Sequence, residues 1–112
     1  KMNAVVAITG AIDIVADAEK AYCIYNGCPE MSSITGTGCQ LSALTAAFVT
    51  ANQEQPLEAA AAAVCAMGLA GETAYARLSE LDGNATYRNY IIDAIYRMNR
   101  EALEAGAKFE VR

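Results

Sequence analysis

The chain has 112 residues, which is enough for one small domain. Hydrophobic residues make up 54% and charged residues 19%, and this balance excludes a disordered chain. The formal net charge of −5 is spread thinly and no basic patch is present, so neither nucleic acid nor an anionic membrane is an expected partner.

The first predicted element covers residues 3–9, a continuous run of small and branched apolar side chains. Such a run predicts a strand buried on both faces, as in parallel sheets. The run ends at Thr9-Gly10, and a hydroxyl at the carboxyl end of a buried strand is where α/β folds place ligand contacts. A ligand contact at Thr9 and a simple strand-ending turn are both open interpretations of this position.

Three short antiparallel strands are predicted next. Residues 11–16 and 21–26 are typical strand segments joined by a polar connection. Asn26-Gly27 predicts a two-residue hairpin turn, because both residues tolerate positive φ. The return strand would run from Cys28 to Ser33, and Pro29 favours an edge position for it.

A glycine loop then leads into a helix. Residues 34–43 read Ile-Thr-Gly-Thr-Gly-Cys-Gln-Leu-Ser-Ala, and the helix is predicted from Cys39 to Ala51. Gly36 and Gly38 let the backbone turn tightly and approach a ligand without Cβ interference. The helix presents unpaired N–H groups and the positive end of its dipole, which favour phosphate or a developing oxyanion. An ordinary tight turn is the alternative, because a lone Gly-x-Gly is a weak signal.

The same helix has no charge on any face and is therefore expected to be buried. Pro56 suits the first turn of a second helix, predicted to extend to about Leu81. Its uncharged segment, residues 59–71, is shorter than the ~20 apolar residues that span a bilayer. Gly68 and Gly71 are expected to allow close approach of a neighbouring helix, with residues 39–51 as the candidate.

The last elements are a third helix and a strand. Asp82-Gly83-Asn84 is predicted to end the second helix and cap the third, which extends to Ala105. Gly106 ends that helix, and residues 108–112 alternate in polarity as an edge strand does. The apolar stripe of the third helix is predicted to be core: Tyr87, Tyr90, Ile91, Ala94, Ile95, Met98 and Ala102. Three i,i+4 ion pairs are expected on its surface: Asp93–Arg97, Arg97–Glu101 and Arg100–Glu104.

Four cysteines are present and histidine is absent. The spacing of Cys23, Cys28, Cys39 and Cys65 fits no zinc pattern, and reduced thiols of a cytoplasmic protein are expected. Because histidine is absent, any general base must be a carboxylate, a thiolate, a tyrosine or a lysine. The chain starts with Lys1, so we expect a piece of a longer protein or a processed product.

Several segments together resemble the carboxyl-terminal half of the hydroxyethylthiazole kinase family, over essentially all 112 residues. The segments are Ala7-Ile8-Thr9-Gly10-Ala11-Ile12-Asp13, Asn26-Gly27-Cys28-Pro29, Ile34-Thr35-Gly36-Thr37-Gly38-Cys39-Gln40-Leu41-Ser42-Ala43, Ala66-Met67-Gly68-Leu69-Ala70-Gly71-Glu72 and Ala107-Lys108-Phe109-Glu110-Val111-Arg112. The resemblance implies an α/β class and part of a ribokinase-like fold. We therefore expect residues 1–112 to be the carboxyl-terminal portion of such a kinase domain, a sheet with a short antiparallel meander packed by three helices.

The resemblance also implies an activity: ATP- and Mg²⁺-dependent phosphorylation of 4-methyl-5-(2-hydroxyethyl)thiazole in thiamine salvage. It makes Gly36, Thr37 and Gly38 an anion hole, because backbone N–H groups stabilise a transferring phosphoryl group. It makes Thr9 a nucleotide-phosphate contact and Gly36 a thiazole contact.

Cys39 stands where most ribokinase-like enzymes carry an aspartate base. The start of a helix favours the thiolate form of a cysteine, so Cys39 is expected to take the proton of the substrate hydroxyl. The alternative is a buried packing residue at the start of a core helix.

The chain departs from the family in length. The resemblance places the acidic residues near Mg²⁺ and much of the thiazole pocket in an amino-terminal half that is absent here, and Asp13 is not expected to be a metal ligand. It also implies a homotrimer with thiazole sites between subunits. The chain alone is expected to be inactive. The alternative function is a stand-alone α/β module that binds a phosphate-bearing ligand without catalysis.

Overall fold

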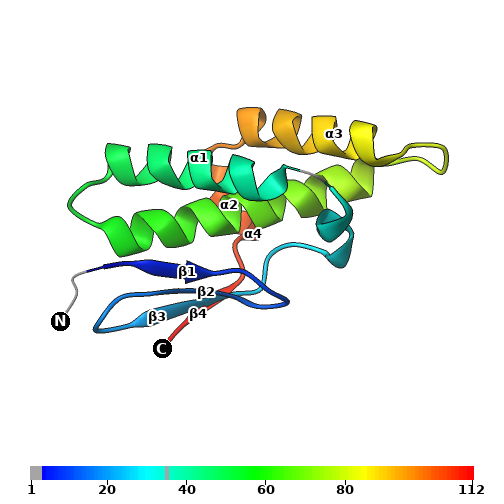
Figure 1. The fold of residues 1–112 in the computed structure, drawn as a ribbon. Helices are drawn as coiled ribbons and strands as arrows, with labels where there is room; N and C mark the ends of the chain where they lie inside the picture. Colours follow the sequence, from blue (N-terminus) through cyan, green and yellow to red (C-terminus); the bar gives the residue numbers. More distant parts are fainter. Residues whose placement is uncertain (1–3, 35) are drawn as a thin grey trace.

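The computed structural model describes residues 4–34 and 36–112, and it has a sheet layer covered on one face by helices (Figure 1). The sheet consists of four strands in the spatial order β1 (Val6–Ile8), β2 (Asp13–Ala16), β3 (Ala21–Ile24) and β4 (Phe109–Val111). All three pairings are antiparallel. The helical elements are η1 (Pro29–Ser33, a 3₁₀ turn), α1 (Thr37–Ala51), α2 (Pro56–Arg77), α3 (Asn84–Arg97) and α4 (Arg100–Gly106).

The predicted antiparallel pairing of residues 11–16 with residues 21–26 is confirmed. β2 and β3 pair with Val15 opposite Tyr22, and the Asp17 carboxylate accepts the backbone N–H groups of Glu19 and Lys20 in the connection. Val15 and Ile24 are 0% exposed and pack against α2 in the core. The final strand is also confirmed, because β4 pairs with β3 and forms one edge of the sheet.

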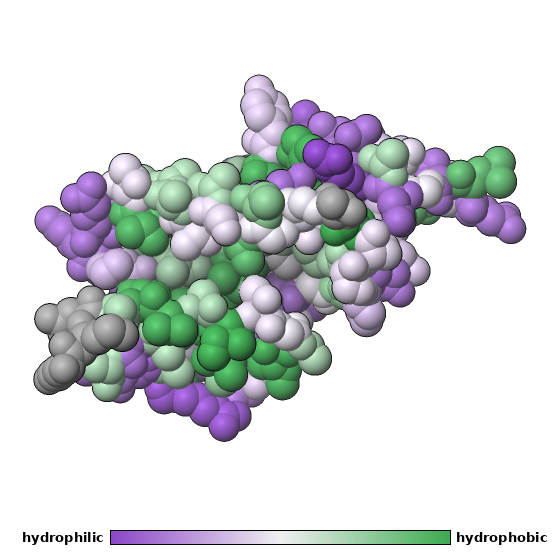
Figure 2. Space-filling model, viewed as in Figure 1, coloured by the Kyte–Doolittle hydropathy of each residue, from purple (hydrophilic) through white to green (hydrophobic). Residues whose placement is uncertain are grey.

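The prediction for the first strand is wrong in two respects. β1 is antiparallel to its neighbour, and its three residues are exposed, with Val6 at 51% and Ile8 at 59%. β1 forms the other edge of the sheet and the helices cover one face only, so the apolar run has no layer over it within the described residues. Figure 2 shows the resulting hydrophobic surface over the sheet, to which Ile12 and Ile14 also contribute.

The predicted return strand from Cys28 to Ser33 is also wrong. Pro29 begins a 3₁₀ turn instead, because its ring fits a first helical turn and it has no N–H to lose. The Ser32 and Ser33 hydroxyls donate to the carbonyls of Pro29 and Glu30, 2.8 Å away in both cases. Gly27 does have a positive φ of 111°, but the chain turns there onto α2 and not back along β3.

The long helix α2 forms the centre of the molecule. It packs on β2, β3, α1, α3 and α4, and most of its residues are buried. By length and composition α2 would qualify as a membrane span, with a mean hydropathy of 1.2, but 67% of that segment is buried inside this fold as in a core helix. It ends at Arg77, four residues earlier than expected.

α1 begins at Thr37, two residues before the predicted start, and the expectation that it is buried is wrong. None of residues 37–51 is buried. The reason is that α1 packs on α2 along one side, as Figure 1 shows, and no described element lies over its outer side.

The glycines of α2 do allow a close approach, but not of α1. A Cβ at Gly68 would lie 2.7 Å from the Asn26 carbonyl carbon, and one at Gly71 would meet the Met31 side chain. The segment after β3 therefore lies directly on α2, and these two glycines leave room for it.

The predicted third helix is two helices. α3 ends at Arg97, and Asn99 caps α4 by accepting the Ala102 N–H at 2.8 Å. Asn84 does not cap α3, because its side chain donates to the Ser33 carbonyl at 3.1 Å.

Most of the predicted apolar stripe does form core, with Tyr87 and Ile91 buried against α2 and with Tyr90, Ala94, Ile95 and Met98 partly buried, but Ala102 lies on α4 and is exposed. Of the three expected ion pairs, Arg100–Glu104 forms within α4, at 3.0 Å. Asp93 lies 3.8 Å from Arg77 of α2, so its ion pair crosses between helices and does not follow the i,i+4 spacing.

Candidate functional site

The candidate site is a cleft of about 540 Å³ where four segments meet. One side is the β1–β2 turn with Thr9, Gly10 and Asp13, and another is the start of α1 with Thr37 and Gly38. The third side is the segment that follows β3. The fourth is an apolar stretch of α2 from Val64 to Gly68. The cleft therefore combines an apolar floor with polar backbone and hydroxyl groups, which is typical of small-molecule sites.

The start of α1 has the features that an anion site requires. Gly36 precedes the helix with a φ of 97°, in the left-handed region, and no side chain caps the helix. The first intrahelical hydrogen bond is donated by Gln40 to the Gly36 carbonyl, so the N–H groups of Thr37, Gly38 and Cys39 have no intrahelical acceptor. A Cβ at Gly36 or Gly38 would meet no atom within 4 Å. The glycines thus leave space at the loop and are not explained by packing against described residues.

The β1–β2 turn brings a hydroxyl and a carboxylate to the same cleft. The Asp13 carboxylate accepts the Gly10 N–H at 2.9 Å and so fixes the turn that presents Thr9. Burial raises the pKa of Asp13, and the hydrogen bond from Gly10 opposes this shift. Asp13 therefore acts on the cleft mainly by shaping the turn.

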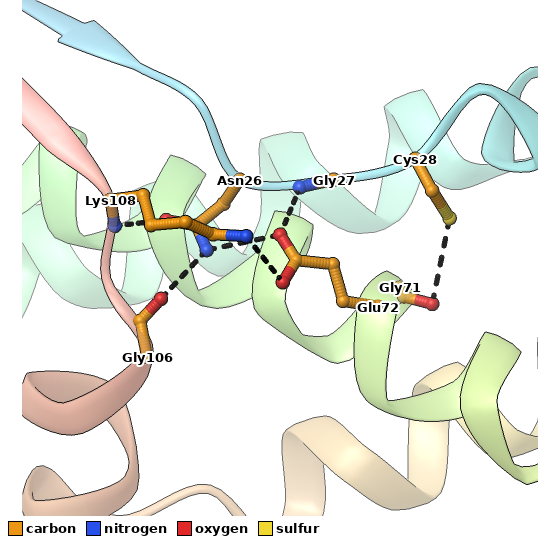
Figure 3. Close-up of polar contacts among 7 residues, drawn as sticks. All are labelled: Asn26, Gly27, Cys28, Gly71, Glu72, Gly106 and Lys108. Atoms are coloured by element: carbon orange, nitrogen blue, oxygen red, sulfur yellow. Dashed lines mark hydrogen bonds and ion pairs between the residues drawn. The ribbon is translucent and has the colours of Figure 1, made fainter.

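The side of the cleft formed by the segment after β3 is held by a polar cluster that Figure 3 shows. Asn26 is 6% exposed and donates its side-chain amide to Glu72 at 3.1 Å and to the Gly106 carbonyl at 2.9 Å. Its Oδ1 accepts the Lys108 N–H at 2.7 Å. Glu72 in turn accepts the Gly27 N–H at 2.6 Å and pairs with the Lys108 ammonium at 3.1 Å. The cluster joins β3, α2 and the strand β4 at one point.

Of the residues predicted for the site, Thr9, Thr37 and Gly38 are brought together as lining of the cleft. Gly36 and Cys39 do not line it. Cys39 lies in the first turn of α1 and is exposed, so no described residue buries it. Thr35 of the glycine motif lies outside the described residues. All four cysteines are free, as expected.

Sequence reasoning missed the contribution of Asn26 and Glu72. Asn26-Gly27 was interpreted as a turn signal, and Glu72 entered only as the last residue of a matching segment. No local signal marks them, because their hydrogen bond joins residues 46 positions apart in the sequence.

The residues present fit a phosphate group better than a metal ion. The free N–H groups and open glycines at α1 suit phosphate oxygens. Over residues 4–34 and 36–112, no group of three or more His, Cys, Asp or Glu side chains could hold a metal ion. Asp13 is the single carboxylate among the cleft-lining residues, and Mg²⁺ prefers several oxygen ligands.

An antiparallel meander against a central helix, with a glycine loop at a helix start beside a cleft, defines an α/β protein with a candidate anion site. The hydroxyethylthiazole kinase family model matches residues 1–101, and the chain belongs to this family. The expected α/β class with an antiparallel meander is therefore confirmed, with four helices in place of the expected three.

Two curated relatives illustrate the similarity. A hydroxyethylthiazole kinase of Clostridium acetobutylicum is 58% identical over 110 residues, covering 98% of this chain and 40% of the relative. One of Zea mays is 38% identical over 110 residues, covering 98% of this chain and 38% of the relative. The solved structure of hydroxyethylthiazole kinase protein from Pyrococcus horikoshii OT3 has a TM-score of 0.87 at 35% identity, covering 98% of this chain and 41% of that one. The chain thus spans about 40% of the length of these relatives.

Proposed function

We propose that the chain is the carboxyl-terminal portion of a ribokinase-like kinase domain and carries the phosphoryl-binding side of its active site. The proposed reaction is ATP-dependent phosphorylation of 4-methyl-5-(2-hydroxyethyl)thiazole in thiamine salvage. The observation that carries the proposal is the start of α1, where Thr37 and Gly38, whose N–H groups have no intrahelical acceptor, border the cleft that Thr9 also lines. The family membership gives this site its reaction class.

In the proposed mechanism, the backbone N–H groups of Thr37 and Gly38 donate hydrogen bonds to the transferring phosphoryl group as its negative charge is redistributed. The Thr9 hydroxyl contacts a phosphate of the nucleotide. Gly36 has no Cβ and lets the thiazole substrate approach the loop. Bound ATP supplies the phosphoryl group.

Cys39 is proposed as the general base. Its thiolate takes the proton of the substrate hydroxyl, whose oxygen forms the new bond to phosphorus while the bond to the ADP oxygen breaks. The exposed position of Cys39 in the first turn of α1 leaves its sulfur accessible to a substrate hydroxyl. The helix start places the positive end of the α1 dipole beside this sulfur.

The described residues form no Mg²⁺ site, so none of the roles that this mechanism assigns to them involves the metal. The relatives are longer than this chain. We propose that the metal ligands and most of the thiazole pocket lie in the additional sequence of a full-length protein. The working protein is proposed to be a cytoplasmic homotrimer, and this chain by itself is expected to be inactive.

The test is an assay of ATP-dependent phosphorylation with the product of the full reading frame and with residues 1–112 alone. The full product is expected to add one phosphate to hydroxyethylthiazole, seen as a mass increase of the thiazole, and the chain alone is not. Absence of phosphorylated thiazole with the full product would contradict the kinase proposal. If the gene encodes residues 1–112 alone, phosphate binding by this chain would favour the stand-alone binding module.

A further inference from the structure

One wall of the cleft has no regular sheet pairing to hold it. Residues 27–31, called the wall segment here, follow the end of β3, and Gly27, Cys28, Pro29 and Met31 line the cleft. The last backbone bond that ties this strand to its neighbour is donated by Tyr25 to the Lys108 carbonyl at 2.8 Å. Another contact must therefore set the position of the wall segment on α2.

Glu72 makes that contact. Its Oε2 accepts both the Gly27 N–H at 2.6 Å and the Asn26 amide at 3.1 Å, and its Oε1 lies 3.1 Å from the Lys108 ammonium. The side chain is 24% exposed, and hydrogen bonds to an ionised group in such a setting are the strong ones. Burial, which alone would raise the pKa of Glu72, is outweighed by the three donors, so that the pKa is lowered.

The backbone at the contact leaves little room for adjustment. Gly27 has a φ of 111°, and Gly68 lies against Asn26 so closely that no Cβ would fit between them. The contact of this part of the chain with α2 thus consists of close packing and of the hydrogen bonds that the Glu72 carboxylate accepts. A shift of Glu72 would displace Gly27 and with it the side of the cleft that faces Thr9 and Gly38.

We propose that Glu72 is a positioning residue of this kinase. Its carboxylate holds the wall segment at the distance from Thr9 at which the cleft accepts the nucleotide. The nucleotide is the ligand concerned because Thr9, its proposed phosphate contact, lies in the same cleft, beside an apolar floor formed by Leu41, Val64 and Met67. This assignment rests on the proposed function, whereas the contact between Glu72 and the wall segment does not.

The test compares Glu72→Gln with Glu58→Gln in the product of the full reading frame. The two glutamates lie on α2, and Glu58 also pairs with a lysine, at 2.7 Å, and accepts a tyrosine hydroxyl, at 3.2 Å, but its partners, Lys20 and Tyr22, lie outside the wall segment. A glutamine at position 72 has a single oxygen and no charge, so its N–H₂ group has to face either the Lys108 ammonium or the two donors that now converge on Oε2. We expect an increase in KM for ATP of about tenfold, with kcat and KM for the thiazole changed less than about twofold. Glu58→Gln should leave all three constants unchanged.

Hydrogen–deuterium exchange of the peptide containing residues 27–31 is the second readout. Faster exchange there in Glu72→Gln, with unchanged exchange in Glu58→Gln, is expected. If Glu72→Gln does not fold, Glu72→Asp takes its place, since it keeps the charge but withdraws the carboxylate from Gly27 by one methylene. A loss of kcat with an unchanged KM for ATP, or unchanged exchange of the wall segment, would overturn the proposal. If the wild-type protein phosphorylates no thiazole, the proposed function fails, and the exchange readout still decides whether Glu72 holds the segment.

Discussion

The Cys28 thiol and the Tyr87 hydroxyl lie 3.0 Å apart, although 59 positions separate them in the sequence. The same hydroxyl donates to the Gly71 carbonyl at 3.0 Å, so it links the wall segment, α2 and α3. Burial, followed by the contact with Cys28, raises the pKa of Tyr87. This tyrosine is therefore a neutral donor at neutral pH.

Tyr87→Phe should destabilise the fold by about 1 kcal/mol, because the Gly71 carbonyl loses a buried hydrogen-bond donor. Urea unfolding at neutral pH measures the effect. The matched control is Tyr96→Phe on the same helix, since Tyr96 is 87% exposed and its hydroxyl contributes little. Equal stability of both variants would contradict the linking function of the Tyr87 hydroxyl.

Gly68→Ala should destabilise the protein by about 1–3 kcal/mol, the usual cost of overpacking. Its Cβ would lie 2.7 Å from backbone and side-chain carbon atoms of Asn26, which Glu72 and Lys108 hold in place. The melting temperature checks this. A Gly68→Ala variant as stable as the wild type would show that the wall segment moves freely on α2.

Gly38→Ala makes a complementary test, because a Cβ there meets no atom within 4 Å. Alanine also has the better helix propensity, so stability should stay equal or rise by up to about 1 kcal/mol. The apparent affinity for ATP or inorganic phosphate should nevertheless fall, because the Cβ would occupy space beside the donating N–H groups. Titration calorimetry and a melting curve on one sample separate the two effects, and undiminished phosphate affinity would rule out the anion hole.

Glu72 gives a pH dependence of stability whose sign follows from its lowered pKa. A carboxyl whose pKa is lower in the folded state stabilises the fold fully above its ordinary value of 4.5, and this contribution is lost as the pH falls through the folded value. The difference in unfolding free energy between wild type and Glu72→Gln should therefore shrink as the pH is lowered from 6 to 3. A difference that stays constant over this range would contradict the hydrogen bonds assigned to the carboxylate.

The sequence predicted most of the regular structure because its signals are local. The alternation in β2 and β3, Pro56 at the start of α2 and Gly106 at the end of α4 all act within a few residues. The failures concern contacts that only the tertiary fold creates. Asn26-Gly27 has the composition of a hairpin turn, but the Asn26 side chain is bonded to groups 46 to 82 positions away.

The same distinction holds for the site. Thr9 could be selected because it ends a predicted strand before a glycine, and Gly38 because it directly precedes a predicted helix, and the structure places both at one cleft. Glu72 could not be selected, because nothing in its neighbourhood on α2 indicates that it reaches the Gly27 N–H. The break between α3 and α4 at Asn99 was hidden for a similar reason, since the apolar pattern continues through it.

The proposed function assigns proton removal to Cys39. Two substitutions in the full protein distinguish a catalytic base from a packing residue at this position. Serine is a much weaker base at neutral pH, so Cys39→Ser should lower kcat by about 10²–10⁴-fold with little change in KM for ATP. Cys39→Asp should retain activity, because it restores the acidic residue that the resemblance places at this position in the wider fold family. Both variants should fold, since Cys39 is exposed in the described structure.

The measurement that tests the central claim most directly is kcat for phosphorylation of hydroxyethylthiazole by the wild type, Cys39→Ser and Cys39→Asp, with melting temperatures measured on the same samples. Our account predicts an active wild type, an active Cys39→Asp and a strongly impaired Cys39→Ser, with melting temperatures close to one another. An active Cys39→Ser beside an inactive and destabilised Cys39→Asp would contradict it and leave Cys39 as a packing residue.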